Sequence, residues 1–314
     1  RACHETELNY HPVSVSKKIA VVGAGPAGLA AATIAAQRGH RITLFEAEAQ
    51  IGGQFNMAKV IPGKEDYAET IRYFAEMLKI QKVKVLTGVK ANTSMLLDDG
   101  FDEYIICTGV TARIPDLEGI DHPKVLSYVD VLYHNKPVGK SVAIIGAGGI
   151  GFDVATFLSQ EGRSFTLNTH DYLKEWGVDF HYSGAGAITE PSPGSSPRKI
   201  YLLKRSGGKH GKSLGRTTGW IHRAHLQHKE VEMLSGVQYL KVDDKGLHIK
   251  VNGQERILEV DNIVVCAGQE PLRDLYNGLK HSGKPVHLIG GAHEAVELDA
   301  KRAIDQAARL VATI

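Results

Sequence analysis

Two short glycine-rich loops of the same design constrain most strongly what this chain can fold into. They read GAGPAG from Gly23 to Gly28 and GAGGIG from Gly146 to Gly151. Each follows an apolar, β-favouring run and precedes a segment of helical composition, which is the order of a dinucleotide-binding strand–turn–helix unit. Such a unit takes about 30 residues. We therefore expect two nucleotide-binding units of the α/β class within the 314 residues.

The first loop is followed by an acidic residue at the place where a ribose would bind. Gly23 permits the tight turn, Gly25 admits a pyrophosphate to the backbone, and Gly28 lets the helix pack closely on the strand. Glu46 ends the next predicted strand, 41–46, where a carboxylate accepts hydrogen bonds from ribose hydroxyls. The alternative is a solvated Glu46 at an ordinary strand end, which the order of the surrounding elements disfavours.

The second loop is followed by basic residues instead. The strand expected after it, 199–205, ends in Lys204 and Arg205, and Arg216 follows in the same basic stretch. Cations at this place bind the 2′-phosphate of NADP, which a carboxylate would repel. The pattern predicts NADP(H) rather than NAD(H). The alternative, that the basic stretch is only a solvated loop, remains open.

One nucleotide bound by an acidic ribose clamp and one bound by its phosphate are the usual pairing of a flavin with a nicotinamide. We therefore predict FAD and NADP(H) as cofactors, bound face to face. Because the cofactors perform the hydride transfer, no side-chain acid or base need be essential, and we name no catalytic residue. The predicted FAD contacts are Gly23, Gly25, Pro26, Ala27, Glu46, Gly53, Gln54, Thr108, Gly109, Gly291 and Ala292. The predicted NADP(H) contacts are Gly146, Gly148, Gly149, Ile150, Gly151, Lys204, Arg205, Arg216, Gly268 and Gln269.

Composition excludes several other classes of function. With 37 basic and 35 acidic residues, the net charge of +2 gives no reason to expect nucleic acid or an anionic membrane as a partner. No apolar run approaches the roughly 18 residues of a membrane span. The three cysteines are far apart and form no C-x-x-C pair, which disfavours a zinc ribbon or a redox dithiol and fits a reducing, cytoplasmic location.

Histidines are numerous, yet their spacing does not indicate a metal site. His222, His225 and His228 fall on a probable helix, but steps of three residues do not bring all of them onto one tight face. We predict no metal site in this chain.

Several segments make the chain recognisable. The first loop with its acidic strand end, ICTG at 106–109 and CAGQEP at 266–271 resemble the two-dinucleotide-binding flavoproteins. A narrower resemblance is to the C-terminal part of bacterial NADPH-dependent 2,4-dienoyl-CoA reductases. It is carried by RACHE, IGGQFNMAKVIPGKE, EGIDHPKVLSY, GRTTGWIHR and GGAHEAVELDAKRAI, and it covers essentially the whole chain.

The resemblance implies that the NADP domain is inserted into the FAD domain. On that basis the FAD domain comprises 17–137 and 262–314, the NADP(H) domain 138–261 with an insertion at about 163–198, and residues 1–16 are a linker remnant of a missing N-terminal region. One departure from the wider family stands at Gly290-Gly291-Ala292, where an aspartate for the flavin ribityl chain is often found. The backbone of Gly291 and Ala292 is expected to serve in its place.

The resemblance also implies a partner. In the family an N-terminal barrel of the same polypeptide carries FMN, a [4Fe–4S] cluster and the acyl-CoA site, and electrons pass from NADPH through FAD, the cluster and FMN to a dienoyl thioester. This chain would be the NADPH:FAD electron-input module, with a role in the β-oxidation of unsaturated fatty acids. The alternatives are the same module of another old yellow enzyme-like enone reductase or amine dehydrogenase, or a structural ADP-binding module.

Two segments keep more than one interpretation. The stretch 216–223, RTTGWIHR, either positions the nicotinamide or gates the flavin, or it is a structural helix start with Trp220 in the core. The insertion at 163–198 is expected to dock the missing barrel, to act as a lid, or to be a disordered flap.

Overall fold

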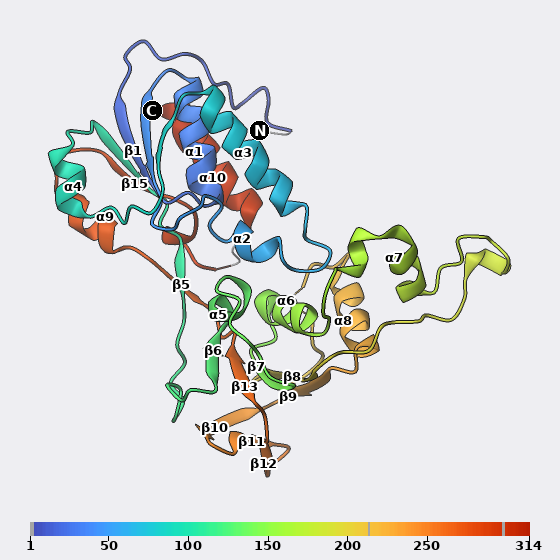
Figure 1. The fold of residues 1–314 in the computed structure, drawn as a ribbon. Helices are drawn as coiled ribbons and strands as arrows, with labels where there is room; N and C mark the ends of the chain where they lie inside the picture. Colours follow the sequence, from blue (N-terminus) through green and yellow to red (C-terminus); the bar gives the residue numbers. More distant parts are fainter. Residues whose placement is uncertain (1–2, 213, 297–298) are drawn as a thin grey trace. The chain divides into compact units, whose positions relative to one another are not determined.

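The chain divides into two compact units, each built on a parallel β-sheet. The computed structural model describes residues 3–212, 214–296 and 299–314. Unit 1 comprises Arg1–Ala58, Asp66–Thr111 and Gln269–Ile314, and unit 2 comprises Lys59–Glu65 and Ala112–Gly268. Figure 1 labels many of the elements of both units. The predicted α/β fold class with Rossmann-like dinucleotide-binding domains is confirmed.

Unit 1 contains a five-stranded parallel sheet in the order β15-β4-β1-β2-β3. Its central strand is almost completely buried, because helices cover both faces and leave no side of the apolar run to water. The strands are β1 (Lys18–Val22), β2 (Arg41–Phe45), β3 (Lys84–Leu86), β4 (Glu103–Ile106) and β15 (Val286–Leu288). The helices are α1 (Pro26–Gln37), α2 (Phe55–Ala58), α3 (Tyr67–Ile80), α4 (Thr93–Asp98), α9 (Asp274–Leu279), the short η3 (Gly290–Ala292) and α10 (Ala300–Thr313).

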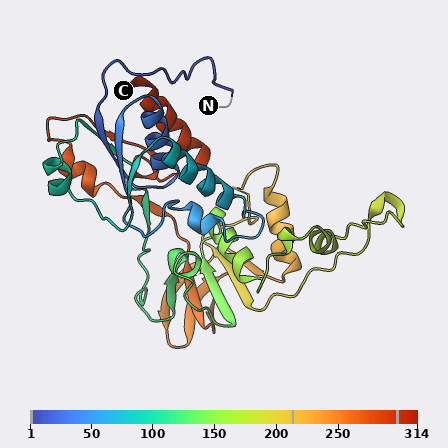
Figure 2. The ribbon, with the colours of Figure 1, turned by 45° about the horizontal axis from the view of Figure 1, so that its top comes forward.

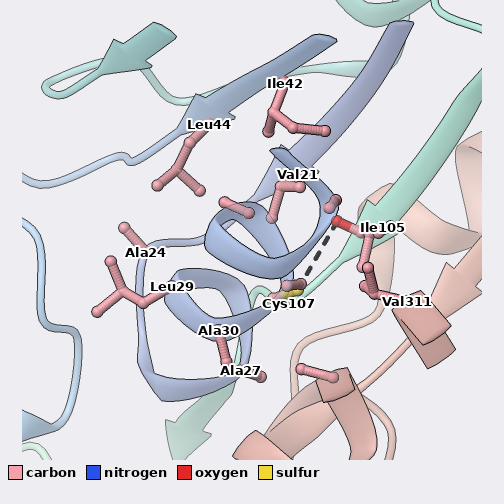
Figure 3. Packing of buried hydrophobic residues seen from close by; sticks show 14 of the residues in the cluster. Val21, Ala24, Ala27, Leu29, Ala30, Ile42, Leu44, Ile105, Cys107 and Val311 are labelled. Atoms are coloured by element: carbon pink, nitrogen blue, oxygen red, sulfur yellow. Dashed lines mark hydrogen bonds between the residues drawn. The ribbon is translucent and has the colours of Figure 1, made fainter. Parts of the chain in front are cut away.

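The core of unit 1 forms around the alanine-rich helix α1. Ala30 and Leu29 of this helix are buried, as are Val21, Leu44 and Ile105 on the strands beside it (Figure 3). A helix that is apolar on every side must be covered on every side, and α1 lies between the sheet and α10, which runs beside it in Figure 1. The small alanine side chains let α1 approach both neighbours closely.

Unit 2 repeats the parallel sheet and adds an antiparallel one. Its parallel order is β6-β13-β7-β8-β9, and β10-β11-β12 form a separate sheet that shares a core with it through Leu203, Ile249 and Leu258. The strands are β6 (Val125–Ser127), β7 (Ser141–Ile145), β8 (Lys199–Lys204), β9 (Glu232–Ser235), β10 (Gln238–Asp243), β11 (Gly246–Val251), β12 (Gln254–Leu258) and β13 (Asn262–Val265). The helices are α5 (Tyr128–Leu132), α6 (Gly149–Leu158), η1 (Phe165–Leu167), α7 (Thr169–Trp176), η2 (Ala185–Ala187) and α8 (Gly219–His228).

The observed division lies away from the boundaries expected at 137/138 and 261/262. Along the chain the division falls on either side of the short segment Lys59–Glu65 and at Thr111/Ala112 and Gly268/Gln269. The last two places lie within β5 (Val110–Ala112) and directly before β14 (Gln269–Pro271), two short strands that pair with each other. The physical reason for the difference is that β6 and β13 pair in the sheet of unit 2. A three-residue strand such as β6, with no glycine turn after it, leaves little trace in the sequence.

The insertion at 163–198 is partly regular. It contains η1, α7 and η2, and the segment after α7 returns through an isolated antiparallel bridge between Val178 and Ile188. In Figure 2 this yellow-green segment extends away from the sheet of unit 2. Phe180, Tyr182 and Ile188 on it are more than half exposed.

Because helix α6 packs closely on the second glycine loop, a single added methyl group at Gly151 should lower the stability of unit 2. A Cβ at Gly151 would lie 1.8 Å from the carbonyl oxygen of Gly146, whereas a Cβ at Gly149 would meet nothing within 4 Å. Gly151→Ala should lower the free energy of unfolding of unit 2 by about 2–3 kcal/mol, as overpacking against backbone does. The matched variant Gly149→Ala should leave it unchanged or slightly higher. Urea unfolding followed by circular dichroism checks both, and equal stabilities would contradict the assigned packing role.

Candidate dinucleotide sites

The first glycine loop forms an open helix N-terminus at the carboxyl end of β1. Gly23 has φ +103°, and a Cβ there would lie 2.4 Å from the carbonyl oxygen of Cys107. A Cβ at Gly28 would lie 1.8 Å from the carbonyl oxygen of Gly23. Gly25 caps α1 without a side-chain hydrogen bond, Pro26 follows, and the first turn holds no acidic residue. The free N–H groups and the helix dipole therefore favour a bound anion such as a pyrophosphate.

A second pass of the backbone runs against this loop. The N–H of Gly52 donates to the carbonyl oxygen of Ala24 at 2.8 Å. Gly53 has φ +50°, and a Cβ there would lie 2.8 Å from the Cα of Gly25. Only glycine fits this approach of two chains, and Gln54 follows it half-buried. The cradle of glycines fits the phosphates of a dinucleotide, which need backbone rather than side chains around them.

Glu46 lies beside the same loop. Its side chain is 8% exposed, and its Oε2 accepts a hydrogen bond from the N–H of Ala24 at 2.7 Å. Its Oε1 accepts from the N–H of Glu48 at 2.9 Å. The two backbone donors hold the carboxylate at the end of β2, and each oxygen retains a lone pair for a further donor. The structure thus places Glu46 where a ribose-binding acid is expected, and the ribose contact itself stays a prediction.

The remaining predicted FAD contacts gather in unit 1 at the carboxyl ends of neighbouring strands. Thr108 and Gly109 follow β4, and the Thr108 hydroxyl donates to the carbonyl oxygen of Leu272 at 2.6 Å. Gly291 and Ala292 lie in η3, which abuts Ala27 of α1, since a Cβ at neighbouring Gly290 would be 2.9 Å from the Ala27 Cβ. The strand order reverses at β1, and ligands of open α/β sheets bind at such a switch point.

The second loop repeats this geometry in unit 2. Gly146 has φ +108°, and a Cβ there would lie 2.4 Å from the carbonyl oxygen of Cys266. Gly148 caps α6 without a side-chain hydrogen bond, and the first turn of α6 holds no acidic residue. Gly148 and Gly149 are exposed, and a Cβ at either would meet nothing within 4 Å. Ile150 beside them is half-buried.

Basic side chains follow β8 as the sequence predicts. We define the basic loop as the described residues 205–212 and 214–218; Arg205 and Arg216 on it are exposed. Lys204 Nζ donates to the carbonyl oxygen of Lys209 at 2.9 Å, so the end of β8 is tied to this loop. Gly268 lies in unit 2 with the other predicted NADP(H) contacts. Gln269, by contrast, begins β14 in unit 1.

Tyr239 on β10 is a residue that the sequence analysis missed. Burial raises the pKa of Tyr239 to about 12, and the opposing influences come from the Arg205 charge and the backbone of Gly146. The phenol is therefore close to the second glycine loop and within electrostatic range of Arg205. No spacing rule could have found it, because β10 belongs to the antiparallel sheet and lies more than eighty residues after the glycine loop.

A polar cluster next to α6 was also missed. Lys64 Nζ lies 2.7 Å from each carboxylate oxygen of Asp153, which stands two residues after Gly151. The pKa of the nearby His222 is lowered, first by burial and then by the Lys64 charge, with Asp153 acting in the opposite direction. The sequence could indicate Asp153, because it closely follows the second glycine loop. It could not indicate its partner, because Lys64 lies in the segment Lys59–Glu65, which belongs to unit 2 although the residues before and after it belong to unit 1.

The stretch 216–223 is not a buried helix start. Helix α8 begins at Gly219, but Trp220 is 58% exposed, and its Nε1 donates to the carbonyl oxygen of Thr217 at 3.0 Å. The interpretation that places Trp220 in the core is therefore wrong. The Trp220 ring is available on the surface of unit 2.

The cysteines are not arranged for thiol chemistry. Cys3 is exposed, whereas Cys107 and Cys266 are buried, and all three are free. Burial raises the pKa of both the Cys107 and the Cys266 thiols far above neutrality, which leaves them as thiols rather than reactive thiolates. Within the described ranges no three metal-ligating side chains come together. Of the helices described, none combines the length and apolar composition that a bilayer crossing requires.

The open space at Gly148 predicts a loss of binding without a loss of folding. Gly148→Ala meets no protein atom within 4 Å, so thermal unfolding of the free protein should be unchanged. The added methyl group would stand where the backbone must approach a pyrophosphate, and the NADP⁺ dissociation constant should rise about tenfold or more. Calorimetric titration measures this, with Gly184→Ala in the insertion as the matched control. Unchanged NADP⁺ affinity would contradict the placement of the site.

Comparison with known proteins shows the family of this chain. The family model for pyridine nucleotide-disulphide oxidoreductases matches residues 17–293. A metal reductase from Desulforamulus reducens is 29% identical over 298 residues, which are 93% of this chain and 43% of that protein. A cinnamate reductase from Clostridium sporogenes is 29% identical over 296 residues, 93% of this chain and 39% of that protein.

Solved structures show the same fold. A 2-naphthoyl-CoA reductase complex superposes with a TM-score of 0.81 at 23% identity, covering 99% of this chain and 42% of that one. Thioredoxin reductase from Lactococcus lactis gives a TM-score of 0.66 at 16% identity, covering 94% and 97%. Measured against the metal reductase and the cinnamate reductase, the chain spans about two fifths of the length of these curated relatives. With both nucleotide loops inside the matched region, the chain belongs to the pyridine nucleotide-disulphide oxidoreductase family of flavoproteins.

Proposed function

We propose that this chain is the NADPH:FAD electron-input module of a larger flavin-dependent reductase. The observation that carries the proposal is that both units contain a glycine loop of the same geometry, while the residues that come after the next strand are acidic in unit 1 and basic in unit 2. The first loop is followed by the buried carboxylate of Glu46, and the second by Lys204 and Arg205. The membership of this chain in the pyridine nucleotide-disulphide oxidoreductase family supports the same pair of ligands, FAD and a nicotinamide nucleotide.

In unit 1, the chain's own residues hold the FAD. The N–H groups at the start of α1 bind the pyrophosphate, while Gly25 and Gly53 leave room for it. Glu46, held by the N–H groups of Ala24 and Glu48, accepts the ribose hydroxyls. The backbone of Gly291 and Ala292 in η3, next to α1, takes the place of the absent ribityl carboxylate.

In unit 2, the chain holds NADPH. The open N-terminus of α6 binds its pyrophosphate, and Arg205 with Arg216 binds the 2′-phosphate. Lys204 contributes by holding the basic loop through the carbonyl oxygen of Lys209. When both cofactors are bound, they supply the hydride transfer, and the protein supplies binding and orientation. No side chain of this chain is required as an acid or base.

The electrons would leave for a region outside this chain. The curated relatives are more than twice as long as the part they share with it. We propose that the region is an N-terminal barrel of the same polypeptide with FMN and a [4Fe–4S] cluster, in the cytoplasm. The cinnamate reductase among the relatives and the 2-naphthoyl-CoA reductase that shares the fold support a 2,4-dienoyl-CoA or similar enone as final acceptor.

A second candidate is the corresponding module of an amine dehydrogenase. An N,N-dimethylglycine/sarcosine dehydrogenase from Chromohalobacter salexigens is 28% identical over 85% of this chain, and histamine dehydrogenase from Rhizobium sp. 4-9 shares the fold with a TM-score of 0.73. Disulfide reduction is disfavoured by the free, separated cysteines. A purely structural ADP-binding module is disfavoured by the cations that follow β8.

Reversing the charge of Arg205 should change coenzyme preference. Arg205→Glu places a carboxylate where the 2′-phosphate is expected, so KM for NADPH should rise about 10–100-fold while KM for NADH changes little. The measurement is steady-state dye reduction by the FAD-loaded protein. Lys245→Glu, an equal charge reversal at an exposed turn of unit 2, is the matched control.

Two results would count against the proposal. An unchanged ratio of the two KM values in Arg205→Glu would refute the phosphate site. A protein that binds no FAD and reduces no dye with either coenzyme would favour the structural ADP-binding module instead.

A further inference from the structure

Buried charges fasten the insertion 163–198 to the end of α8. Glu175, in the last turn of α7, is 4% exposed, and Lys229, directly after α8, is 5% exposed. Lys229 Nζ lies 2.9 Å from Glu175 Oε1 and donates to the carbonyl oxygen of Gly194 at 2.8 Å. The N–H of Gly194 donates in turn to Glu175 Oε2 at 3.2 Å. One ion pair therefore holds both the outgoing and the returning arm of the insertion.

Aromatic rings enclose this ion pair. The Phe165 ring stacks on the ring of His225, with centroids 5.5 Å apart and planes at 17°. Lys229 Nζ lies 5.7 Å from the centre of the same Phe165 ring, and His225 Nδ1 lies 3.5 Å from Glu175 Oε1. Removing one member of such a desolvated pair leaves the other charge buried without its partner. The pair consequently constrains where α8 ends relative to α7.

Helix α8 in turn constrains the basic loop. Gly219, the first residue of α8, packs so closely on Leu214 that a Cβ there would lie 2.9 Å from the Leu214 Cβ. The N–H of Gly219 donates to the carbonyl oxygen of Gly215 at 2.7 Å. Arg223 Nη1, one turn further along α8, donates to the carbonyl oxygen of His210 at 3.5 Å. A shift of α8 would therefore move the backbone that carries Arg216.

We propose that Glu175 and Lys229 are positioning residues for recognition of the NADP(H) 2′-phosphate. They hold α8 in place, and α8 holds the basic loop in the conformation that presents its cations. Neither side chain contacts the coenzyme. The inference rests on the proposed NADP(H) site and adds a specificity role for the insertion, which would otherwise be only a surface feature.

The test is the ratio of two dissociation constants, measured by calorimetry on the full chain. Glu175→Gln keeps the shape of the side chain and removes its charge. The ratio of the NADP⁺ to the NAD⁺ dissociation constant should rise about tenfold, the size of effects transmitted through packed elements. The double variant Glu175→Gln, Lys229→Met, which removes both charges, should bring the ratio back to within about threefold of the wild-type value.

Leu247→Ala serves as the control for destabilisation alone, because Leu247 is fully buried in the antiparallel sheet of unit 2 and pairs with Val242 and Leu258 rather than with Tyr239. It should weaken folding without changing the ratio. Should Glu175→Gln not fold, Phe165→Leu, which removes the ring beside Lys229, takes its place with the same expected rise.

The outcomes separate this inference from the proposed function. A wild-type chain that prefers NADP⁺, together with an unchanged ratio in Glu175→Gln or its substitute, would overturn the positioning role alone. An equal rise in Leu247→Ala would overturn it as well. A wild-type chain that binds NAD⁺ as tightly as NADP⁺ would overturn the proposed NADP(H) site, and with it this inference.

Discussion

The contact on which the rest of the structure depends is the approach of a helix to its strand at a glycine. In both units the glycine that closes the loop, Gly28 or Gly151, stands where a Cβ would be 1.8 Å from the carbonyl oxygen of the glycine that opens it. This approach aims the start of the helix at the carboxyl end of the central strand. Because glycines cap α1 and α6 without side-chain hydrogen bonds, the N–H groups there stay free for an anion.

What distinguishes the two sites is the charge placed after the next strand. In unit 1, the carboxylate of Glu46 lies next to the first loop and is held by two backbone N–H groups. In unit 2, Lys204 ends β8 and Arg205 follows it, and Lys204 is tied to the basic loop. The same backbone geometry thus recurs in both units, and the charge that comes after the next strand differs between them. In our proposal the insertion and α8 belong to this second feature, since they hold the basic loop that carries Arg216 and not the glycine loop.

Much of this arrangement could be predicted from the sequence, because it depends on local features. In unit 1, the glycines at fixed spacing, the apolar strand before them and the charged strand end after them are all contained within about 30 residues. In unit 2 the strand and its glycines are equally local, but the insertion 163–198 separates them from the basic strand end. The unit boundary could not be predicted in the same way, because β6 joins β13 across more than a hundred residues of chain. Tyr239, and Lys64 with Asp153, depend likewise on contacts between distant segments. The Glu175–Lys229 pair is a further case, since neither residue belongs to a recognisable motif.

The central claim is that one chain binds FAD in unit 1 and NADPH in unit 2 and passes electrons from the second to the first. The most direct measurement is an anaerobic titration of the FAD-loaded chain with NADPH, followed in the visible absorption band of the flavin. The account predicts that the band bleaches in proportion to the NADPH added, up to one equivalent per flavin, and that NADH is a poorer reductant. A chain that binds FAD but keeps its oxidised spectrum in excess NADPH would contradict it.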